Sequence, residues 1–139
     1  MLTPDDFNQR SQGYLPAHLG IRVTEVGVGR LKAELAIEPF HIAPNGYLHA
    51  GTVVTLADTT SGYGCVANLP AGAIGFTTLE LKCNHIGTAR NGVIDCIATA
   101  VHMGGTTQVW DAVVTRRDTG NVIALFRCTQ IILYSKQVS

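Results

Sequence analysis

The pattern of hydrophobic and polar positions sets one long uncharged stretch apart from several shorter alternating ones. The uncharged stretch runs from His49 to Leu69, and Asp58 is its only charged residue. A helix of this composition is apolar or small on nearly every side, so the rest of the domain must enclose it. An ionised carboxylate in such a helix is costly without local compensation. Asp58 is therefore expected to be either a catalytic residue or a hydrogen-bonded structural one.

Alternating segments on both sides of this helix predict strands. Two precede it, at residues 21–26 and 30–37, and Gly27-Val28-Gly29 between them predicts a hairpin. Four follow it, at residues 74–84, 92–101, 107–115 and 122–133. Residues 3–12 predict a short helix, residues 16–20 a connection and residues 38–47 an ordered loop. Two strands, one helix and four strands predict a single α+β domain over residues 1–139, with an antiparallel sheet.

Two glycines lie inside the predicted helix. Gly62 and Gly64 each weaken a helix by on the order of 1 kcal/mol relative to alanine. We expect them to let the backbone of the sheet, or of a partner subunit, approach the helix closely.

Composition narrows the classes of partner. The hydrophobic fraction is 46% and the charged fraction 14%, which predicts a packed core and a surface partly buried against another subunit. A net charge of zero without a basic run argues against nucleic acid. The chain shows no secretory signal, and the central helix is too polar to read as membrane-spanning, so a cytoplasmic protein without a membrane partner is expected. The cysteines are expected to be reduced core residues: Cys65, Cys83, Cys96 and Cys128.

Three stretches have the order and spacing of a known set of motifs. The first is His49-Ala50-Gly51 followed by Leu56-Ala57-Asp58, the second covers residues 84–92, and the third covers residues 102–110. Together they resemble the hotdog-fold acyl-CoA thioesterases, in the branch of the phenylacetate-pathway and 4-hydroxybenzoyl-CoA thioesterases. The likeness covers roughly residues 41–134. It implies the hotdog fold, a curved antiparallel sheet of about six strands wrapped around one long central helix.

The resemblance implies thioester hydrolysis, in which Asp58 acts as general base toward water or as a nucleophile; the sequence leaves both open. The backbone amide of Gly51, at the positive end of the helix, is the expected oxyanion donor. A rise of about 1.5 Å per residue separates the two by about 10 Å, too far for one thioester. The family's dimer resolves this, because Gly51 then comes from a second subunit. We therefore expect a homodimer, extended to a homotetramer.

Further residues around the acid are assigned roles by the resemblance. His49 is expected to position the thioester, or only to bond backbone near the cap. Thr78 is expected to hold the attacking water, or to be an ordinary strand residue. Ser61 is a candidate substrate-binding residue from its position alone: one turn past Asp58, its hydroxyl is expected to bond that carboxylate or, instead, a helix carbonyl. Relatives carry an amide fifteen residues before the acid; here that position is Ala43, and Asn45 is the nearest replacement.

The CoA moiety is expected to lie against a second group of residues. His85 and Arg90 follow the strand after the helix, and the Arg90 guanidinium suits a phosphate, although a solvated turn arginine is the alternative. Backbone amides of Gly104, Gly105 and Thr106 are expected at pantetheine or phosphate, or else form a plain hairpin turn. No metal site is expected, because the histidines lack ligand spacing.

The sequence therefore predicts an acyl-CoA thioesterase that needs no cofactor beyond the CoA of its substrate. Aromatic and aliphatic acyl groups both fit. Within the same fold the alternative is an acyl-thioester dehydratase or hydratase, although no His–carboxylate pair stands out. The alternative from another class is a non-catalytic acyl-CoA-binding module, which Ala43 makes plausible.

Overall fold

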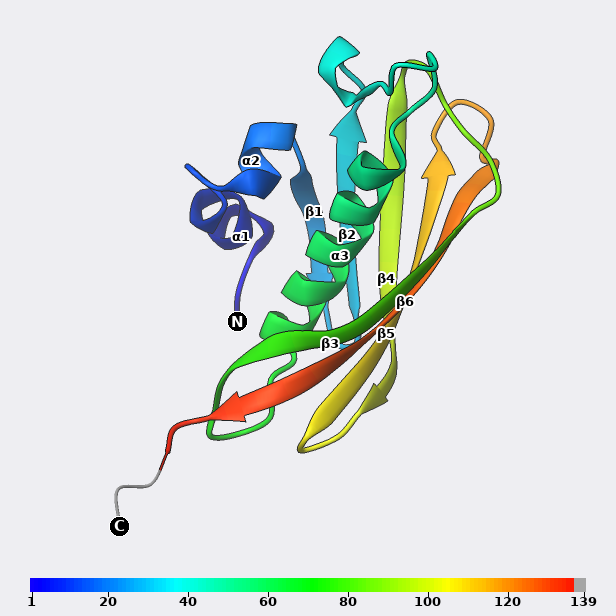
Figure 1. Cartoon of the computed structure of the whole chain (residues 1–139). Helices are drawn as coiled ribbons and strands as arrows, with labels where there is room; N and C mark the ends of the chain where they lie inside the picture. The colour runs from blue at the N-terminus through cyan, green and yellow to red at the C-terminus, as the bar shows by residue number, and fades with distance from the viewer. Residues whose placement is uncertain (137–139) are drawn as a thin grey trace.

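One long helix lies across one curved sheet (Figure 1). The structure is a computed structural model that describes residues 1–136. The helix, α3, spans Ala50–Ala67. The six antiparallel strands lie in the order β1-β2-β4-β5-β6-β3. Their bounds are β1 Arg22–Gly27, β2 Arg30–Ala36, β3 Ala73–His85, β4 Val93–Met103, β5 Thr107–Arg116 and β6 Val122–Tyr134. This is the predicted hotdog architecture, and each predicted strand is confirmed to within a few residues.

The connection that follows α3 decides which strand becomes an edge. β3 follows α3 in the chain but pairs with β6, so it forms one edge of the sheet and β1 forms the other. In Figure 1, β3 and β6 run together diagonally past the helix. Large apolar side chains remain exposed along or beside this edge, at Ile74, Leu79, Leu81 and Ile86. A long apolar edge strand is a surface that proteins normally protect or pair.

The helix packs on the sheet through small residues facing aromatic ones. A Cβ atom added to Gly64 would lie 2.7 Å from the Trp110 ring, and one added to Gly62 would lie 2.9 Å from Cζ of Phe76. Trp110 is fully buried under the helix. The predicted close approach at both glycines is confirmed, although aromatic side chains, not backbone, make it. Either glycine changed to alanine would push the helix off the sheet.

Two short helices precede the sheet, where only one was predicted. α1 (Pro4–Arg10) begins at a Thr3 capping box and buries Phe7 against the Tyr63 ring of α3, with 4.8 Å between ring centroids. α2 (Leu15–Leu19) replaces the predicted connection and ends at Gly20, whose φ of 85° is left-handed. The prediction missed α2 because five residues are too few to show a helical period.

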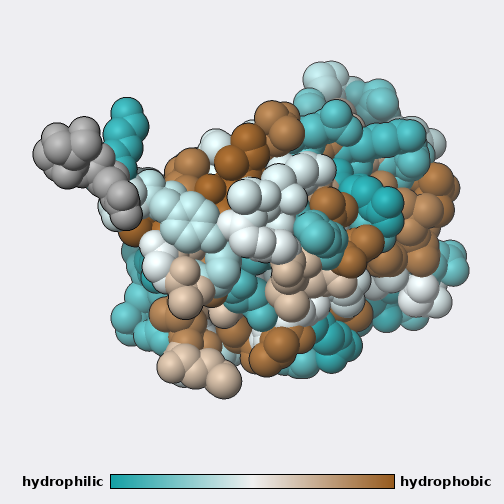
Figure 2. All heavy atoms as spheres, turned by 90° about the horizontal axis from the view of Figure 1, so that it is seen from below, coloured by the Kyte–Doolittle hydropathy of each residue, from teal (hydrophilic) through white to brown (hydrophobic). Residues whose placement is uncertain are grey.

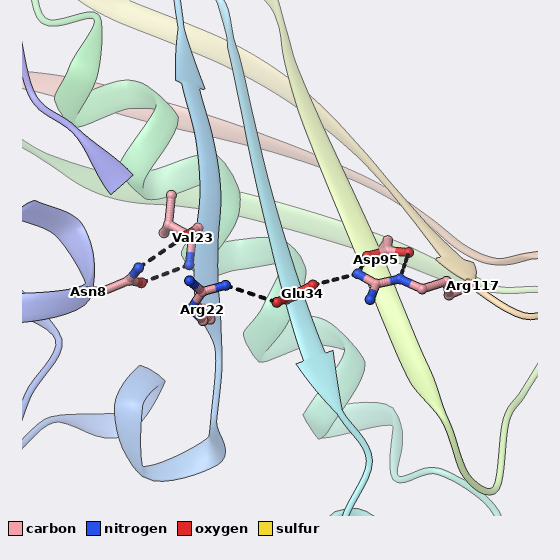
Figure 3. A network of polar contacts seen from close by, with 6 residues as sticks. All are labelled: Asn8, Arg22, Val23, Glu34, Asp95 and Arg117. Atoms are coloured by element: carbon pink, nitrogen blue, oxygen red, sulfur yellow. Dashed lines mark hydrogen bonds and ion pairs between the residues drawn. The ribbon is translucent and has the colours of Figure 1, made fainter. Parts of the chain in front are cut away.

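A network of charges crosses the strands on the side away from the helix (Figure 3). Glu34 of β2 and Asp95 of β4 are direct cross-strand partners, so two carboxylates face each other. Arg117 bonds both, with 3.0 Å between its Nε and Asp95 Oδ2, and Arg22 of β1 reaches Glu34 at 3.3 Å. These bonds raise the pKa of Arg117 further. The arginine therefore removes a repulsion that the strand register creates.

The remaining expectations from composition concern the core and the membrane. All four cysteines are free, and Cys65, Cys96 and Cys128 are buried, as predicted for core thiols. Within residues 1–136, no helix is both long and apolar enough to cross a membrane. Apolar and polar atoms are mixed over the end of the molecule that Figure 2 shows.

Candidate active site

Asp58 lies in the middle of α3, close enough to β6 for its charge to act on the Cys128 thiol. It is half-buried, and its Oδ1 atom is buried without a hydrogen-bond partner among the described residues. Burial raises the pKa of this carboxyl above its usual 3.8. Cys128 of β6 faces it; burial raises the pKa of that thiol to about 12, and the Asp58 charge adds to the rise. The hydrogen bonds that a purely structural carboxylate would need are therefore missing at Oδ1.

Ser61, one turn further along α3, is fully buried beside this carboxylate. Its hydroxyl has no hydrogen-bond partner within residues 1–136. Both expectations for Ser61, a bond to Asp58 and a bond to a helix carbonyl, are therefore wrong for this chain alone. The neighbouring Thr60 does bond back to the Leu56 carbonyl at 2.6 Å, so the helix offers that geometry and Ser61 does not use it.

Thr78 lies on the helix-facing side of β3, because it is the cross-strand partner of Gln130, which is fully buried. A break in the register between Thr78 and Glu80 marks a β-bulge there. Bulges are common next to active sites, where they re-aim a side chain. Thr78 is exposed since β3 is an edge strand.

Gln130 is a residue that the sequence analysis missed. Neither atom of its carboxamide has a hydrogen-bond partner among the described residues. The available signal was one glutamine within the apolar stretch of β6. Whether this glutamine faces the helix depends on how the strands pair, and one glutamine in the sequence does not indicate that.

The start of α3 is capped by a side chain that precedes it. His49 is the N-cap residue, and its Nδ1 atom accepts the Gly51 N–H at 2.8 Å. This is the backbone-bonded alternative for His49. Gly51 itself is an exposed residue. In this arrangement the expected oxyanion donor is already occupied by the imidazole, which must turn away before a carbonyl oxygen can replace it.

The loop before the helix brings an arginine from a distant turn to the same end of α3. Leu48 N–H donates to the Ala89 carbonyl at 3.2 Å, which joins the two loops. The Arg90 guanidinium lies over the Tyr47 ring, 4.3 Å from its centroid. This stacking favours a fixed, exposed cation near Gly51. Tyr47 is the second residue that the sequence analysis missed.

Two further candidates near this end differ in their surroundings. Asn45 accepts the Tyr47 N–H at 3.1 Å and so shapes its own loop. His85 is exposed at the end of β3. Each lies on the same side of the molecule as the start of the helix.

The Gly104, Gly105 and Thr106 segment forms the hairpin turn between β4 and β5. The Gly104 N–H donates to the Thr107 carbonyl at 2.9 Å, and the Thr106 carbonyl accepts Ile132 N–H at 2.9 Å. The hairpin-turn alternative describes this geometry. Gln108, just after the turn, donates to the carbonyl of Asn68, which caps the C-terminal end of α3. The turn therefore lies at the end of the helix opposite Gly51.

Within one chain the candidates thus fall into three groups along α3. Asn45, His49, Gly51 and Arg90 lie at its start, Asp58 and Ser61 in its middle, and the β4–β5 turn at its end. Seven residues separate Gly51 from Asp58 in the helix, about 10 Å at about 1.5 Å per residue. One chain therefore does not bring the acid and the expected oxyanion donor onto one thioester.

No group of three or more His, Cys, Asp or Glu side chains within residues 1–136 is placed to hold a metal ion. Apart from Asp58, the buried side-chain polar atoms without a partner in this part of the chain belong to an alcohol, Ser61, and an amide, Gln130.

Comparison with known proteins assigns a family to this geometry. The profile of the thioesterase superfamily matches residues 45–123, which include α3 and strands β3 to β5. The chain is 32% identical over 111 residues to the 1,4-dihydroxy-2-naphthoyl-CoA hydrolase of Listeria monocytogenes, covering 80% of this chain and 89% of that protein.

Solved structures agree with this assignment. Thioesterase HI1161 of Haemophilus influenzae superposes with a TM-score of 0.90 at 25% identity, covering 96% of this chain and 92% of that one. The E. coli PaaI protein, from the phenylacetic acid degradation operon, has the same fold, with a TM-score of 0.79 at 19% identity over 87% of this chain and 85% of that one. The chain therefore belongs to the thioesterase superfamily and is a thioester hydrolase.

Proposed function

We propose that the enzyme hydrolyses an acyl-CoA thioester and that Asp58 is its catalytic carboxylate. The observation that carries the assignment is a half-buried carboxylate whose Oδ1 atom is buried without a hydrogen-bond partner among residues 1–136. The ionised form takes a proton from water as the water oxygen bonds to the thioester carbon. When the C–S bond breaks, the proton passes to the CoA sulfur, and free acid and CoA leave. Direct attack by Asp58, through a mixed anhydride that water then cleaves, uses the same residue.

The oxyanion that forms on the carbonyl oxygen needs a hydrogen-bond donor, and we assign this role to Gly51 of a second subunit. The first turn of a helix presents N–H groups and a positive dipole end. His49 holds the Gly51 amide until substrate arrives, and its ring then turns aside and lines the thioester. Asn45 is our candidate for the amide role that Ala43 cannot fill, and Thr78 our candidate for orienting the water.

A second subunit is supplied in this proposal by pairing of two β3 edges. The support is the exposed apolar edge, which includes Ile74, Leu79 and Leu81. Two-fold pairing of such strands buries that edge in both chains and is self-complementary. It also turns two α3 helices toward each other, as a site shared between subunits requires. Dimers of this kind then associate into the proposed tetramer.

The CoA moiety is proposed to lie along the start of the helix. Arg90, held over Tyr47, presents a planar cation to a phosphate, and His85 lies on the same side. The turn of Gly104, Gly105 and Thr106 lies at the other end of α3 and would reach the CoA only from a neighbouring subunit. Hydrolysis uses water as co-substrate and needs no cofactor beyond the CoA.

An aromatic acyl group is the proposed substrate class. The support is the 32% identity to a protein named 1,4-dihydroxy-2-naphthoyl-CoA hydrolase. A fused-ring aroyl-CoA and a medium-chain fatty acyl-CoA, compared by kcat/KM, distinguish this class from the aliphatic one. We expect the aromatic thioester to be the better substrate.

The test is release of CoA thiol by the wild type and by Asp58→Asn. The variant keeps the shape of the side chain but cannot accept the proton, so its kcat should fall by roughly a hundredfold or more. Equal turnover by both proteins would rule out the Asp58 assignment. CoA binding without release from any thioester would favour a binding module, and hydration of an enoyl-CoA would favour a hydratase.

A further inference from the structure

Gln130 is a buried amide in an otherwise apolar environment. It is fully enclosed, and neither Oε1 nor Nε2 has a hydrogen-bond partner among the described residues. Burial of an amide without such partners is unfavourable, and native interiors almost always avoid it.

A second glutamine makes the comparison direct. Gln108 of β5 is the cross-strand partner of Gln130 and is just as buried. Its Nε2 donates to the Asn68 carbonyl at 2.9 Å, and its Oε1 accepts the Trp110 indole N–H at 2.8 Å. Both polar atoms of the Gln108 amide thus have partners, which hold the end of α3 on the sheet, whereas neither polar atom of Gln130 has one.

The strand register places Gln130 opposite the middle of α3. Two residues before it on the same face lies Cys128; burial and the Asp58 charge raise the pKa of its thiol, and the adjacent Ser61 hydroxyl, which does not meet hydrogen-bond geometry with any described residue, lowers it. Two residues after it lies Ile132, the partner of Phe76, whose ring contacts Gly62. The amide therefore faces the turns of the helix that carry Asp58 and Ser61.

The buried side-chain polar atoms that lack a partner within residues 1–136 lie on only two elements, α3 and β6. They are Asp58 Oδ1, the Ser61 hydroxyl and both atoms of the Gln130 amide. An apolar residue at any of the three positions would remove the desolvation cost. Locally unfavourable groups that converge on one place are typical of functional sites.

We infer that Gln130 is a positioning residue, which together with Ser61 holds an ordered water against Oδ1 of Asp58. The inference rests on the proposed function, because it assumes that Asp58 is the catalytic carboxylate. The amide supplies a donor and an acceptor, the hydroxyl supplies either, and a water between them donates a hydrogen to the carboxylate. With Oδ1 fixed in this way, Oδ2 keeps one orientation toward the thioester.

The matched variants are Gln130→Met and Gln108→Met, because methionine has a similar length but no amide. Removing the unpartnered amide should leave Tm unchanged or raise it, while kcat falls roughly tenfold with little change in KM. Gln108→Met should do the reverse, with Tm lower by about 3 °C or more and kcat within about twofold, since two partners lose their bonds. A lower Tm for Gln130→Met, with kcat retained, would show a structural role and overturn the inference.

A double-mutant cycle tests whether the amide and the hydroxyl act through the same water. Ser61→Ala alone should also lower kcat by roughly tenfold, and the double variant with Gln130→Met should lose no more than either single one. Losses that multiply to about a hundredfold would mean independent actions and would contradict the shared water.

Activity of the wild type separates this inference from the proposed function. A wild type that releases no CoA from any thioester would overturn both. If the wild type is active, Asp58→Asn abolishes that activity and Gln130→Met leaves it unchanged, only the positioning role of Gln130 would be overturned.

Discussion

The Nδ1 atom of His49 accepts the N–H of Gly51 at 2.8 Å, so one residue masks the donor that its neighbour would offer to a substrate. Gly51 is exposed, and it lies too far from Asp58 of the same chain to act on the same thioester. Both facts favour a site that combines Gly51 of one chain with Asp58 of another. A Cβ atom at position 51 would lie 2.9 Å from the same nitrogen, so a larger residue would disturb the cap and block the amide.

A site shared between subunits predicts rescue by mixing two inactive variants. Asp58→Asn and Gly51→Val should each be nearly inactive alone. Co-expression should restore about a quarter of wild-type activity, because half of the dimers are mixed and one of their two sites is intact. Thiol release by the co-purified proteins measures this. Circular dichroism of each variant serves as the folding control, and activity no greater than that of the single variants would place the whole site within one chain.

Asp58 should destabilise the folded protein as the pH rises. Burial raises the pKa of this carboxyl above 3.8, so the folded state holds the proton more tightly than the unfolded state does. Stability is therefore lost as pH rises from the unfolded to the folded pKa, and the full cost applies above both. Asp58→Asn should have a higher Tm than the wild type at pH 7, and the difference should shrink toward pH 4.

Asp118→Asn is the control, because its effect on Tm at pH 7 should have the opposite sign to that of Asp58→Asn. Its hydrogen bond to Arg116 lowers the pKa of Asp118, so the wild-type carboxylate stabilises the fold above its unfolded pKa. This exposed variant should lose a little stability at pH 7. Thermal unfolding at several pH values measures the Tm of both variants. Tm changes of the same sign and size for Asp58→Asn and Asp118→Asn would contradict burial as the cause of the Asp58 effect.

Arg90→Ala should weaken binding of the CoA moiety. Loss of a charge-assisted contact to phosphate should raise KM roughly tenfold with little change in kcat. A thioester of the same acid with N-acetylcysteamine, which lacks the nucleotide, should be hydrolysed equally by both proteins. Tyr47→Leu removes only the stacking at 4.3 Å and should have a smaller effect on KM. A KM that rises for both substrates would instead place Arg90 near the acyl group.

Arg117→Ala should destabilise the sheet through repulsion between its two partners. Without the arginine, Glu34 and Asp95 face each other across β2 and β4 with no bridging cation. Because the site is exposed, we expect only a small loss of stability, reduced further at 1 M salt. Urea unfolding at low and high salt measures it. Arg116→Ala, which breaks only the pair with Asp118, should cost less.

Elements could be predicted from the sequence where a long pattern identified them. The uncharged stretch around Asp58 and the alternation in the strands were sufficient for the helix, the strands and, with the motifs, the hotdog fold. α2 could not be predicted, because five residues show no period and its left-handed end at Gly20 resembles an ordinary loop.

The surroundings of the candidate site were harder to predict than its residues. Tyr47 and Arg90 are far apart in the chain, and only the folded loops place one over the other. Gln130 of β6 could be interpreted only from the strand register, which pairs it with Thr78. Thr78 lies on β3, which follows α3 in the chain but pairs with β6 at the edge of the sheet. The catalytic and CoA-binding roles of the site residues stay predictions until the variants are measured.

The strand that leaves α3 also forms the open edge of the sheet, so the acid and the proposed contact surface are neighbours in sequence. Residues 50–85 contain the whole of α3 and β3 and nothing else but their short connection. Recombination that exchanged residues 50–85 between two related genes would transfer Asp58 and the β3 edge, which determines the partner subunit, together. Subunits with matching edges would then assemble with their own kind, and mixed enzymes with mismatched half-sites would be rare.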